Sequence, residues 1–416
     1  MADRGRSTLG GCGRFALKRD GQDRPMPPKT MPIPVLTIAQ MREWEQATWA
    51  AGQTEDTVIR RVGELLAQRA RQLTRPSDRI LILAGRGHNG DDARCAEPHL
   101  QDRQVELIEV RDPGLARAEV AAALSRRPAL VIDGLFGIGL NRPLGREWIE
   151  LIEAVNGAKA SVLAVDVPSG LNGDTGEPMG AAIRAALTLT LGAPKQGLVR
   201  SSATAFVGRL EVAPEIGLTA CPATSLLQWT LPSDFTGYPP PRSAGGHKGT
   251  YGHLAIFAGS LGYHGAAVLA ARGAQRAQPG LITLLTAPAV YQPVAAQLQA
   301  VMVQPWSPGM RWPNATALLF GPGLAAPDLP EEWKAELCRE WCESALPVLA
   351  DASGLDWLPE GSTFPGALRL ITPHPGEAAR LLKTTAKAVQ ADRPAALGEL
   401  SARYGDCWVV LKGHQT

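Results

Sequence analysis

An aspartate stands where an apolar run ends and the chain has to turn. Residues 163–165 (Leu-Ala-Val) lead into Asp166, and Pro168 and Gly170 prevent a strand from continuing. Because ligands bind beyond the carboxyl ends of the strands in open parallel α/β sheets, Asp166 and Ser169 are expected to face a crevice. An aspartate at such a turn can also cap the next helix, and this turn alone leaves both interpretations open.

Two further apolar runs end in polar residues. Residues 79–84 lead into residues 85–92, a glycine-rich turn that can bring backbone N–H groups close to a phosphate at a helix start. Another run leads into Asp133. In a parallel sheet the side-chain oxygens of Asn89, Asp133 and Ser169 would converge at one edge. Such oxygen ligands suit an alkali or alkaline-earth cation better than zinc.

Strands and helices must alternate along the chain to position these residues. Apolar runs that end in turn residues predict strands, and apolar residues at helical period predict the helices between them. The predicted strands end at residues 84, 132 and 165, and the predicted helices span residues 37–45, 57–73 and 146–155. This alternation predicts an α/β fold with a Rossmann-like, doubly wound parallel sheet.

The length of 416 residues suffices for two or three domains. A stretch rich in proline and glycine predicts a linker, and the first residues lack the apolar segment of a secretory signal. The expected organisation is a disordered extension at 1–34, a first domain at 35–218, a linker at 219–246 and a second α/β domain at 247–416. Strands of the second domain are expected at 253–260, 281–285, 317–320, 347–350 and 408–411, and a small-residue helix from 265.

Composition argues against several classes of partner. Hydrophobic residues make up 45% of the chain and its net charge is +2, so nothing attracts it strongly to nucleic acid or an anionic membrane. No apolar run reaches the roughly 18 residues that span a bilayer. The six cysteines are scattered, as in reduced proteins of the cytoplasm. We therefore expect a cytoplasmic protein that acts on a small molecule, without nucleic acid or membrane partners.

Ordered sequence blocks carry a family resemblance. The blocks GRGHNGDD, DGLFGIGLNRPLG, AVDVPSGLNGDTG, LTLGAPKQGL and VGRLEVAPEIGL resemble the NAD(P)H-hydrate epimerase domain. Farther along, HKGTYGHLAIFAGSLGYHGAAVLAARGAQRA, ALLFGPGL and ITPHPGEAARLL resemble the ADP- or ATP-dependent NAD(P)H-hydrate dehydratase, a ribokinase-like domain. Across residues 35–416 the chain is thus similar to the two-domain bacterial nicotinamide nucleotide repair enzymes.

For the first domain the resemblance implies an epimerase of R- and S-NAD(P)HX, the hydrated forms of NADH and NADPH. Exchange of the two epimers requires the hydroxyl beside the ring nitrogen to leave as water and return on the other face, and Asp166 is implied as its acid/base. Asn89, Asp133 and Ser169 match the ligands of a potassium ion. The implied substrate-binding positions are His88, Asn89, Gly90, Asp91, Asp92, Gly137, Ile138 and Gly139. A homo-oligomer is also expected.

The glycine-rich loop departs from the family pattern Gly-Asn-Asn-Gly-Gly-Asp-Gly. Here Asp91 replaces a glycine, and its carboxylate should weaken pyrophosphate binding unless the side chain points away. Ala93 also loses the ease with which glycine adopts a positive φ. Lys195 could contact a substrate phosphate, and a solvated loop lysine is the alternative.

For the second domain the resemblance implies S-NAD(P)HX dehydration with ADP or ATP and Mg²⁺. Ala266, Gly323 and His374 match its substrate-contacting positions. The start of its nucleotide-phosphate loop is matched by Lys412, Gly413, His414, Gln415 and Thr416. Ser353 stands where the family usually has an aspartate, and the family continues past this point with a Gly-x-Gly-Asp segment. The domain is therefore expected to be incomplete, and the chain as given is not expected to carry out the dehydration.

Two other functions remain open at this point. A small-molecule kinase of the ribokinase superfamily would explain the second half of the chain but not the AVDVPSGLNGDTG block. A non-catalytic binding or scaffold protein is the other alternative, because related epimerase-like domains occur in such proteins. The near-neutral charge and the retained Asp166, Asn89, Asp133 and Ser169 argue against it.

Overall fold

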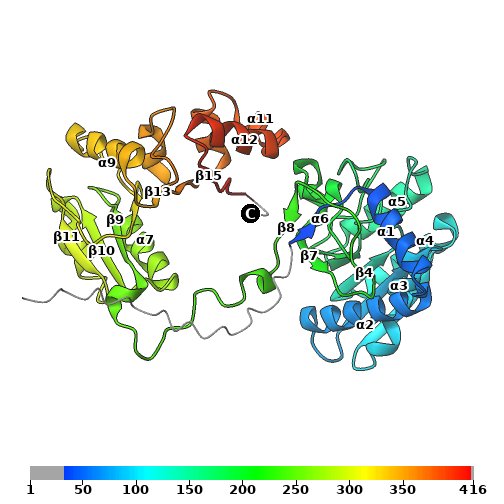
Figure 1. Cartoon of the computed structure of the whole chain (residues 1–416). Helices are drawn as coiled ribbons and strands as arrows, with labels where there is room; N and C mark the ends of the chain where they lie inside the picture. The colour runs from blue at the N-terminus through cyan, green and yellow to red at the C-terminus, as the bar shows by residue number, and fades with distance from the viewer. Residues whose placement is uncertain (1–31, 414–416) are drawn as a thin grey trace, which may run out of the picture.

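The computed structural model describes residues 32–413, and its two parallel sheets lie in separate lobes (Figure 1). The first lobe comprises residues 33–229 and the second residues 253–409. Of the expected nucleotide-binding residues, His414, Gln415 and Thr416 lie outside the described part, as do residues 1–31. No helix within residues 32–413 is long and apolar enough to cross a membrane.

The first lobe holds a six-stranded sheet in the order β3-β2-β4-β5-β6-β7, with every neighbouring pair parallel. Its strands are β2 (Arg79–Ala84), β3 (Gln104–Glu109), β4 (Leu130–Gly134), β5 (Ser161–Val165), β6 (Leu187–Leu191) and β7 (Arg209–Ala213). The chain leaves β2 toward β3 and then crosses to β4 on the other side. A crevice is expected at such a reversal of strand order, beyond the carboxyl ends of β2 and β4.

Helices cover both faces of this sheet. They are α1 (Ile38–Ala50), α2 (Glu55–Leu73), α3 (His88–Arg94), α4 (Pro113–Ser125), α5 (Arg146–Gly157) and the single turn α6 (Thr204–Val207). Ile82 shares a buried cluster with Leu66 of α2, whereas Leu83, its neighbour on β2, shares another with Val120 of α4. Successive strand residues face opposite sides of a sheet, so both faces are buried. The predicted doubly wound α/β fold is confirmed.

The second lobe holds a seven-stranded parallel sheet in the order β11-β10-β9-β12-β13-β14-β15. Its strands are β9 (His253–Phe257), β10 (Leu281–Thr286), β11 (Met302–Pro305), β12 (Ala317–Phe320), β13 (Val348–Ala350), β14 (Arg369–Ile371) and β15 (Trp408–Val409). Its helices are α7 (His264–Arg276), α8 (Tyr291–Ala295), α9 (Glu331–Glu343), α10 (Pro375–Leu381), α11 (Ala386–Ala391) and α12 (Arg393–Arg403). The second α/β unit is therefore present.

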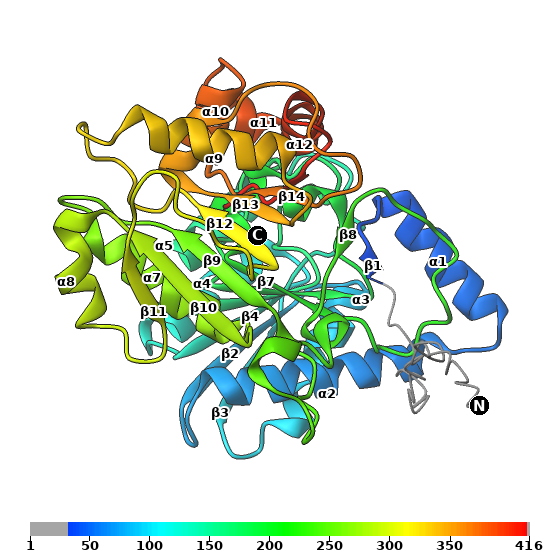
Figure 2. The ribbon, with the colours of Figure 1, turned by 60° about the vertical axis from the view of Figure 1, so that its left-hand side comes forward.

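A two-stranded ribbon lies where the sequence suggested an extension and a linker. Strand β1 (Ile33–Pro34) pairs antiparallel with β8 (Gln228–Trp229), and the two lie side by side in Figure 2. The Trp44 indole also donates to the Thr219 carbonyl at 2.9 Å. Residues 33–34 are thus not a free extension, and the first part of the expected linker packs on the first lobe. Backbone pairing satisfies N–H and C=O groups that composition alone left unassigned.

Candidate functional site

A cavity of about 750 Å³ opens at the carboxyl edge of the first sheet. The residues predicted for the site that line it are His88, Asn89, Asp92, Gly137, Ile138, Gly139 and Asp166. Asp133 of β4 stands beside Leu83 of β2 and Ala164 of β5. The loops after these three strands therefore begin at the same edge of the sheet, and they carry the lining residues. Helix α1 adds Arg42 and Glu45 to the wall, which the sequence analysis did not foresee.

Two residues of the predicted substrate loop do not line the cavity. Gly90 lies against the backbone of Gly85, where a Cβ would come within 2.1 Å of the Gly85 carbonyl oxygen. Asp91 pairs with Arg94, with 2.5 Å between Oδ1 and Nη1, so its carboxylate is turned to a cation of its own helix. Ala93 is buried within α3 and needs no positive φ. The expected conflict between Asp91 and a pyrophosphate therefore has no support in this geometry.

Asp166 occupies a strained turn at the end of β5. Its φ is +63°, a left-handed conformation that residues other than glycine seldom adopt and that occurs often at functional sites. Its Oδ1 accepts hydrogen bonds from the Lys195 ammonium, from the Leu191 N–H at 3.0 Å and from the Thr190 hydroxyl at 3.2 Å. The next regular element is strand β6, so the helix-capping interpretation is wrong.

Lys195 is fully buried, and neither role considered from the sequence describes it. Its ammonium contacts Asp166 and donates to the Leu191 carbonyl at 2.8 Å and to the Thr190 hydroxyl at 3.3 Å. A buried ammonium is tolerated when an opposite charge and hydrogen-bond acceptors surround it. Lys195 therefore fixes the orientation of Asp166, and the three donors to the carboxylate within residues 32–413 all go to Oδ1.

Asn89, Asp133 and Ser169 do come together, around the backbone of Phe136. Asp133 accepts from the Ser169 hydroxyl at 2.6 Å and from the Ser169 N–H at 2.8 Å. The Phe136 N–H donates to the Ser169 hydroxyl at 2.8 Å, and the Asn89 amide donates to the Phe136 carbonyl at 3.0 Å.

Asp133 has no cationic side chain as a partner in the part of the chain that the structure describes. Burial raises its pKa to about 6 despite the hydrogen bonds from Ser169, and it forms no ion pair within residues 32–413. A carboxylate, a hydroxyl, an amide and a backbone carbonyl offer only oxygen donors to a cation. These residues fit a potassium ion by their chemistry.

Two more carboxyl groups reach the cavity from helices. Burial, followed by the charge of Asp166, raises the pKa of Asp92 well above its usual range. The same two causes raise the pKa of Glu45, although Lys195 and His88 oppose them. With Glu55 and Asp166, four carboxyl groups thus line this cavity together with one buried lysine.

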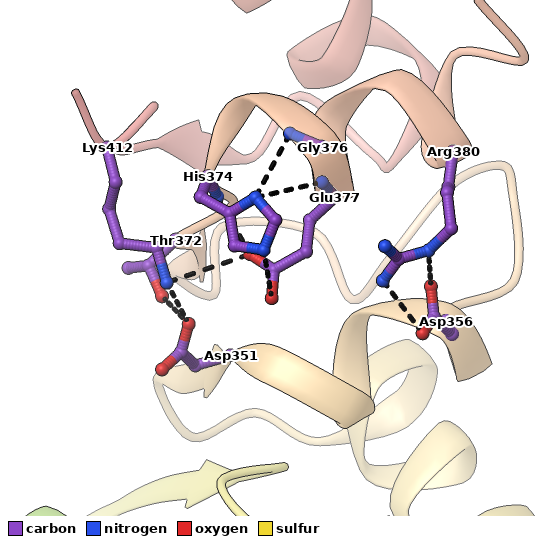
Figure 3. Close-up of polar contacts among 8 residues, drawn as sticks. All are labelled: Asp351, Asp356, Thr372, His374, Gly376, Glu377, Arg380 and Lys412. Atoms are coloured by element: carbon purple, nitrogen blue, oxygen red, sulfur yellow. Dashed lines mark hydrogen bonds and ion pairs between the residues drawn. The ribbon is translucent and has the colours of Figure 1, made fainter. Parts of the chain in front are cut away.

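In the second lobe a polar cluster forms where β13, β14 and β15 end (Figure 3). The Lys412 ammonium lies 2.9 Å from Oδ1 of Asp351 and 3.7 Å from Oε2 of Glu377. The Thr372 hydroxyl donates to the same Asp351 oxygen at 2.7 Å. His374 caps α10, because its Nδ1 accepts from the Gly376 N–H at 3.0 Å. Its Nε2 lies 3.4 Å from Oε1 of Glu377, so His374 and Lys412 contact the same carboxylate.

Ala266 and Gly323 form a separate contact in the second lobe. Gly323 has a φ of +69°, and a Cβ there would come within 2.8 Å of the Ala266 Cβ and 2.6 Å of the Tyr263 carbonyl oxygen. Only glycine fits this close approach.

Gly413, at the start of the expected nucleotide-phosphate loop, lies against Arg393, since a Cβ there would meet the guanidinium at 2.9 Å.

Comparison with known proteins identifies relatives of both halves of the chain. Residues 115–197 match the family model of the YjeF-related protein N-terminus, and residues 254–416 match that of NAD(P)H-hydrate dehydratase. A bifunctional NAD(P)H-hydrate repair enzyme from Coxiella burnetii is 33% identical over 90% of this chain and 80% of its own length. Its counterpart from Gloeobacter violaceus is 34% identical over 92% of this chain and 81% of its own.

A solved structure also resembles part of the chain. The ADP/ATP-dependent NAD(P)H-hydrate dehydratase from Bacillus subtilis is 28% identical, covering 42% of this chain and 63% of that one, with a TM-score of 0.36. So low a score adds nothing to the comparison of folds. The identity to full-length relatives decides the assignment: the chain belongs to the family of bifunctional NAD(P)H-hydrate repair enzymes.

Proposed function

We propose that this chain takes part in the repair of hydrated nicotinamide nucleotides, with an epimerase site for R- and S-NAD(P)HX in the first lobe and a dehydratase-like site that binds the S-epimer and a nucleotide in the second. One observation supports the epimerase site above others. A buried ammonium, that of Lys195, fixes one carboxylate oxygen of Asp166 at the wall of the cavity. The other oxygen of Asp166 is left to exchange protons with a substrate.

The chemistry of epimerisation matches this arrangement. When the hydroxyl beside the ring nitrogen leaves as water, the ring is left as an iminium ion that water can attack from either face. A group that gives and takes a proton within hydrogen-bond reach accelerates both steps. Asp166 is suited to take the proton from the returning water, because its orientation is fixed before the substrate binds.

We propose that a potassium ion is held by Asn89, Asp133 and Ser169, together with the Phe136 carbonyl. When bound, the ion would supply a positive charge that helps to position the substrate. The buried and uncompensated Asp133 supports this proposal. Asn89 itself lines the cavity, so this cluster would fix the cavity wall where the substrate lies.

For the second lobe we propose a site for the S-epimer near Ala266, Gly323 and His374, with ADP or ATP near Lys412. Within residues 32–413 no group of three or more His, Cys, Asp or Glu residues is arranged to hold a metal. Mg²⁺ would enter with the nucleotide phosphates, as it commonly does. Titration with ADP and Mg²⁺ should show binding that Lys412→Ala weakens. Equal affinities would contradict the assignment. A cytoplasmic location and a homo-oligomer stay predictions.

Epimerisation itself is tested with the separated R- and S-epimers of hydrated NADH. In potassium chloride the protein should speed their interconversion far above the buffer rate, as followed by chromatography. Tetramethylammonium chloride at equal ionic strength should slow the reaction, and Asp133→Asn should remove the difference between the two salts. Interconversion at the buffer rate in both salts would contradict the epimerase proposal.

A further inference from the structure

Asp92 has a buried carboxyl oxygen without a partner. The residue is 6% exposed and lines the cavity, and its Oδ1 makes no hydrogen bond in the part of the chain that the structure describes. Buried polar atoms are nearly always hydrogen-bonded, so an unpartnered oxygen marks the carboxyl of this cavity-lining residue as a place where an entering group can bind. The carboxyl therefore has a hydrogen-bonding position left for a ligand.

Helix α3 holds Asp92 rigidly against the sheet. Ala93 touches β4, since a Cβ on Gly134 would come within 2.5 Å of its side chain. Gly90, also in α3, packs against the backbone of Gly85, which lies just after β2. A group carried on packed secondary structure keeps its direction better than one on a loop. Asp92 is thus held in place at the wall of the cavity that Asp166 also lines.

The charges around Asp92 oppose its ionisation. Burial is the largest cause of its raised pKa, followed by Asp166 from β5, Asp91 from its own helix and Glu45 from α1. Lys195 acts in the opposite direction, but its ammonium contacts Asp166. Two carboxyl groups in one cavity therefore have different environments, one with a cation and one without. Such pairs divide the acid and base roles of a reaction between them.

Resting on the proposed epimerase function, we propose that Asp92 is the general acid of this site and Asp166 its general base. The protonated Asp92 carboxyl gives its proton to the substrate hydroxyl as the carbon–oxygen bond breaks, which releases water and leaves the iminium ion and the Asp92 carboxylate. Water then attacks the other face and gives its proton to Asp166. Proton exchange through water restores both carboxyl groups, so the cycle consumes nothing.

The test compares Asp92→Asn with the wild-type chain on a single epimer of hydrated NADH. The amide keeps the shape and can still donate a hydrogen bond, but it cannot transfer a proton. We expect kcat to fall by about 100-fold or more with little change in KM. Asp102→Asn makes the same chemical change at an exposed position outside the cavity and should leave kcat unchanged.

The pH profile distinguishes acid catalysis from a structural role. Because the acid must be protonated, wild-type kcat/KM should fall as pH rises through the pKa of Asp92. Asp92→Asn should lose that descending limb, and Asp92→Glu should recover part of the rate and show the limb again. A variant Asp92→Asn with wild-type kcat, or with the limb unchanged, would overturn the proposal.

Infrared spectroscopy can detect the protonated Asp92 carboxyl directly. The measurement requires no catalytic turnover, and the variants need not be as stable as wild type. The wild-type protein at neutral pH should show the C=O band of a buried protonated carboxyl, which Asp92→Asn or Asp92→Ala should lack. A wild-type spectrum without such a band would overturn the proposal. If the wild-type chain shows the band but does not interconvert the epimers, the epimerase function fails while the protonation of Asp92 stands.

Discussion

The Lys195 ammonium and the Asp166 carboxylate contact each other in the interior of the first lobe, although 29 positions separate them in the sequence. Lys195 is fully buried and Asp166 is 6% exposed. The contact depends on the pairing of β5 with β6, because Asp166 follows the first strand and Lys195 follows the second. The fold thus places a buried ion pair at the wall of a cavity.

Lys195→Met should destabilise the first lobe strongly. Removing one partner of a buried ion pair leaves the other charge uncompensated, at a cost of about 3 to 5 kcal/mol. Urea unfolding measures the loss. Lys159→Met is the matched control, because Lys159 is exposed, and should change stability by less than about 0.5 kcal/mol. Equal stabilities of the two variants would mean that the pair is not formed in solution.

Asp92 should make the first lobe less stable as pH rises. Its pKa in the folded chain lies well above the usual value, so the folded state holds the proton more tightly than the unfolded state. This contribution is complete below about pH 4 and is lost as pH rises through the folded pKa. Asp92→Asn does not titrate. The stability of Asp92→Asn relative to wild type should therefore increase with pH, and a difference independent of pH would contradict the account.

Asp91→Gly should leave the affinity for the hydrated dinucleotide unchanged. The Asp91 carboxylate pairs with Arg94 and does not line the cavity, so no repulsion of a pyrophosphate is removed. The variant should lose up to about 1 kcal/mol of stability, because glycine disfavours the helix. KM at low ionic strength measures the affinity. A KM well below that of wild type would show that the carboxylate faces the ligand.

Arg369→Met should destabilise the second lobe by on the order of 3 kcal/mol. This buried guanidinium donates to the carbonyls of Trp341, Ser344 and Leu346, which would lose their partner. Thermal unfolding of the second lobe is the measurement. Arg276→Met, at an exposed position of α7, is the control. Indistinguishable melting of the two variants would show that solvent replaces the lost bonds without penalty.

The sequence predicted some strands whose residues form a simple local pattern and missed others, among them β6, in which leucine and threonine alternate. Strands β2 and β4 are unbroken apolar runs ending in turn residues, and both were foreseen. Strand β3 has polar residues at Gln104, Glu106 and Glu109, as suits the edge of a sheet, and was missed. Strand β14 was missed too, because it begins with the buried Arg369.

The site was predicted in the same uneven way. Asn89, Asp133 and Ser169 were foreseen as a cluster because each lies at or just beyond a strand end. The partner of Asp166 was not, since no sequence spacing reports which residues the pairing of two strands will bring together. Glu45 was also missed, because the position of α1 over the sheet edge follows from tertiary packing alone.

The central claim is that Asp166 moves a proton during epimerisation, and Asp166→Asn tests it most directly. The amide oxygen can still accept from Lys195, so the turn keeps its shape while proton transfer is lost. The kcat for interconversion of the hydrated NADH epimers should fall by about 100-fold or more, with substrate binding close to that of wild type. The variant should still fold, although at a lower unfolding temperature, because the buried Lys195 ammonium loses its counter-charge. A variant that folds and interconverts the epimers at the wild-type rate would contradict the account.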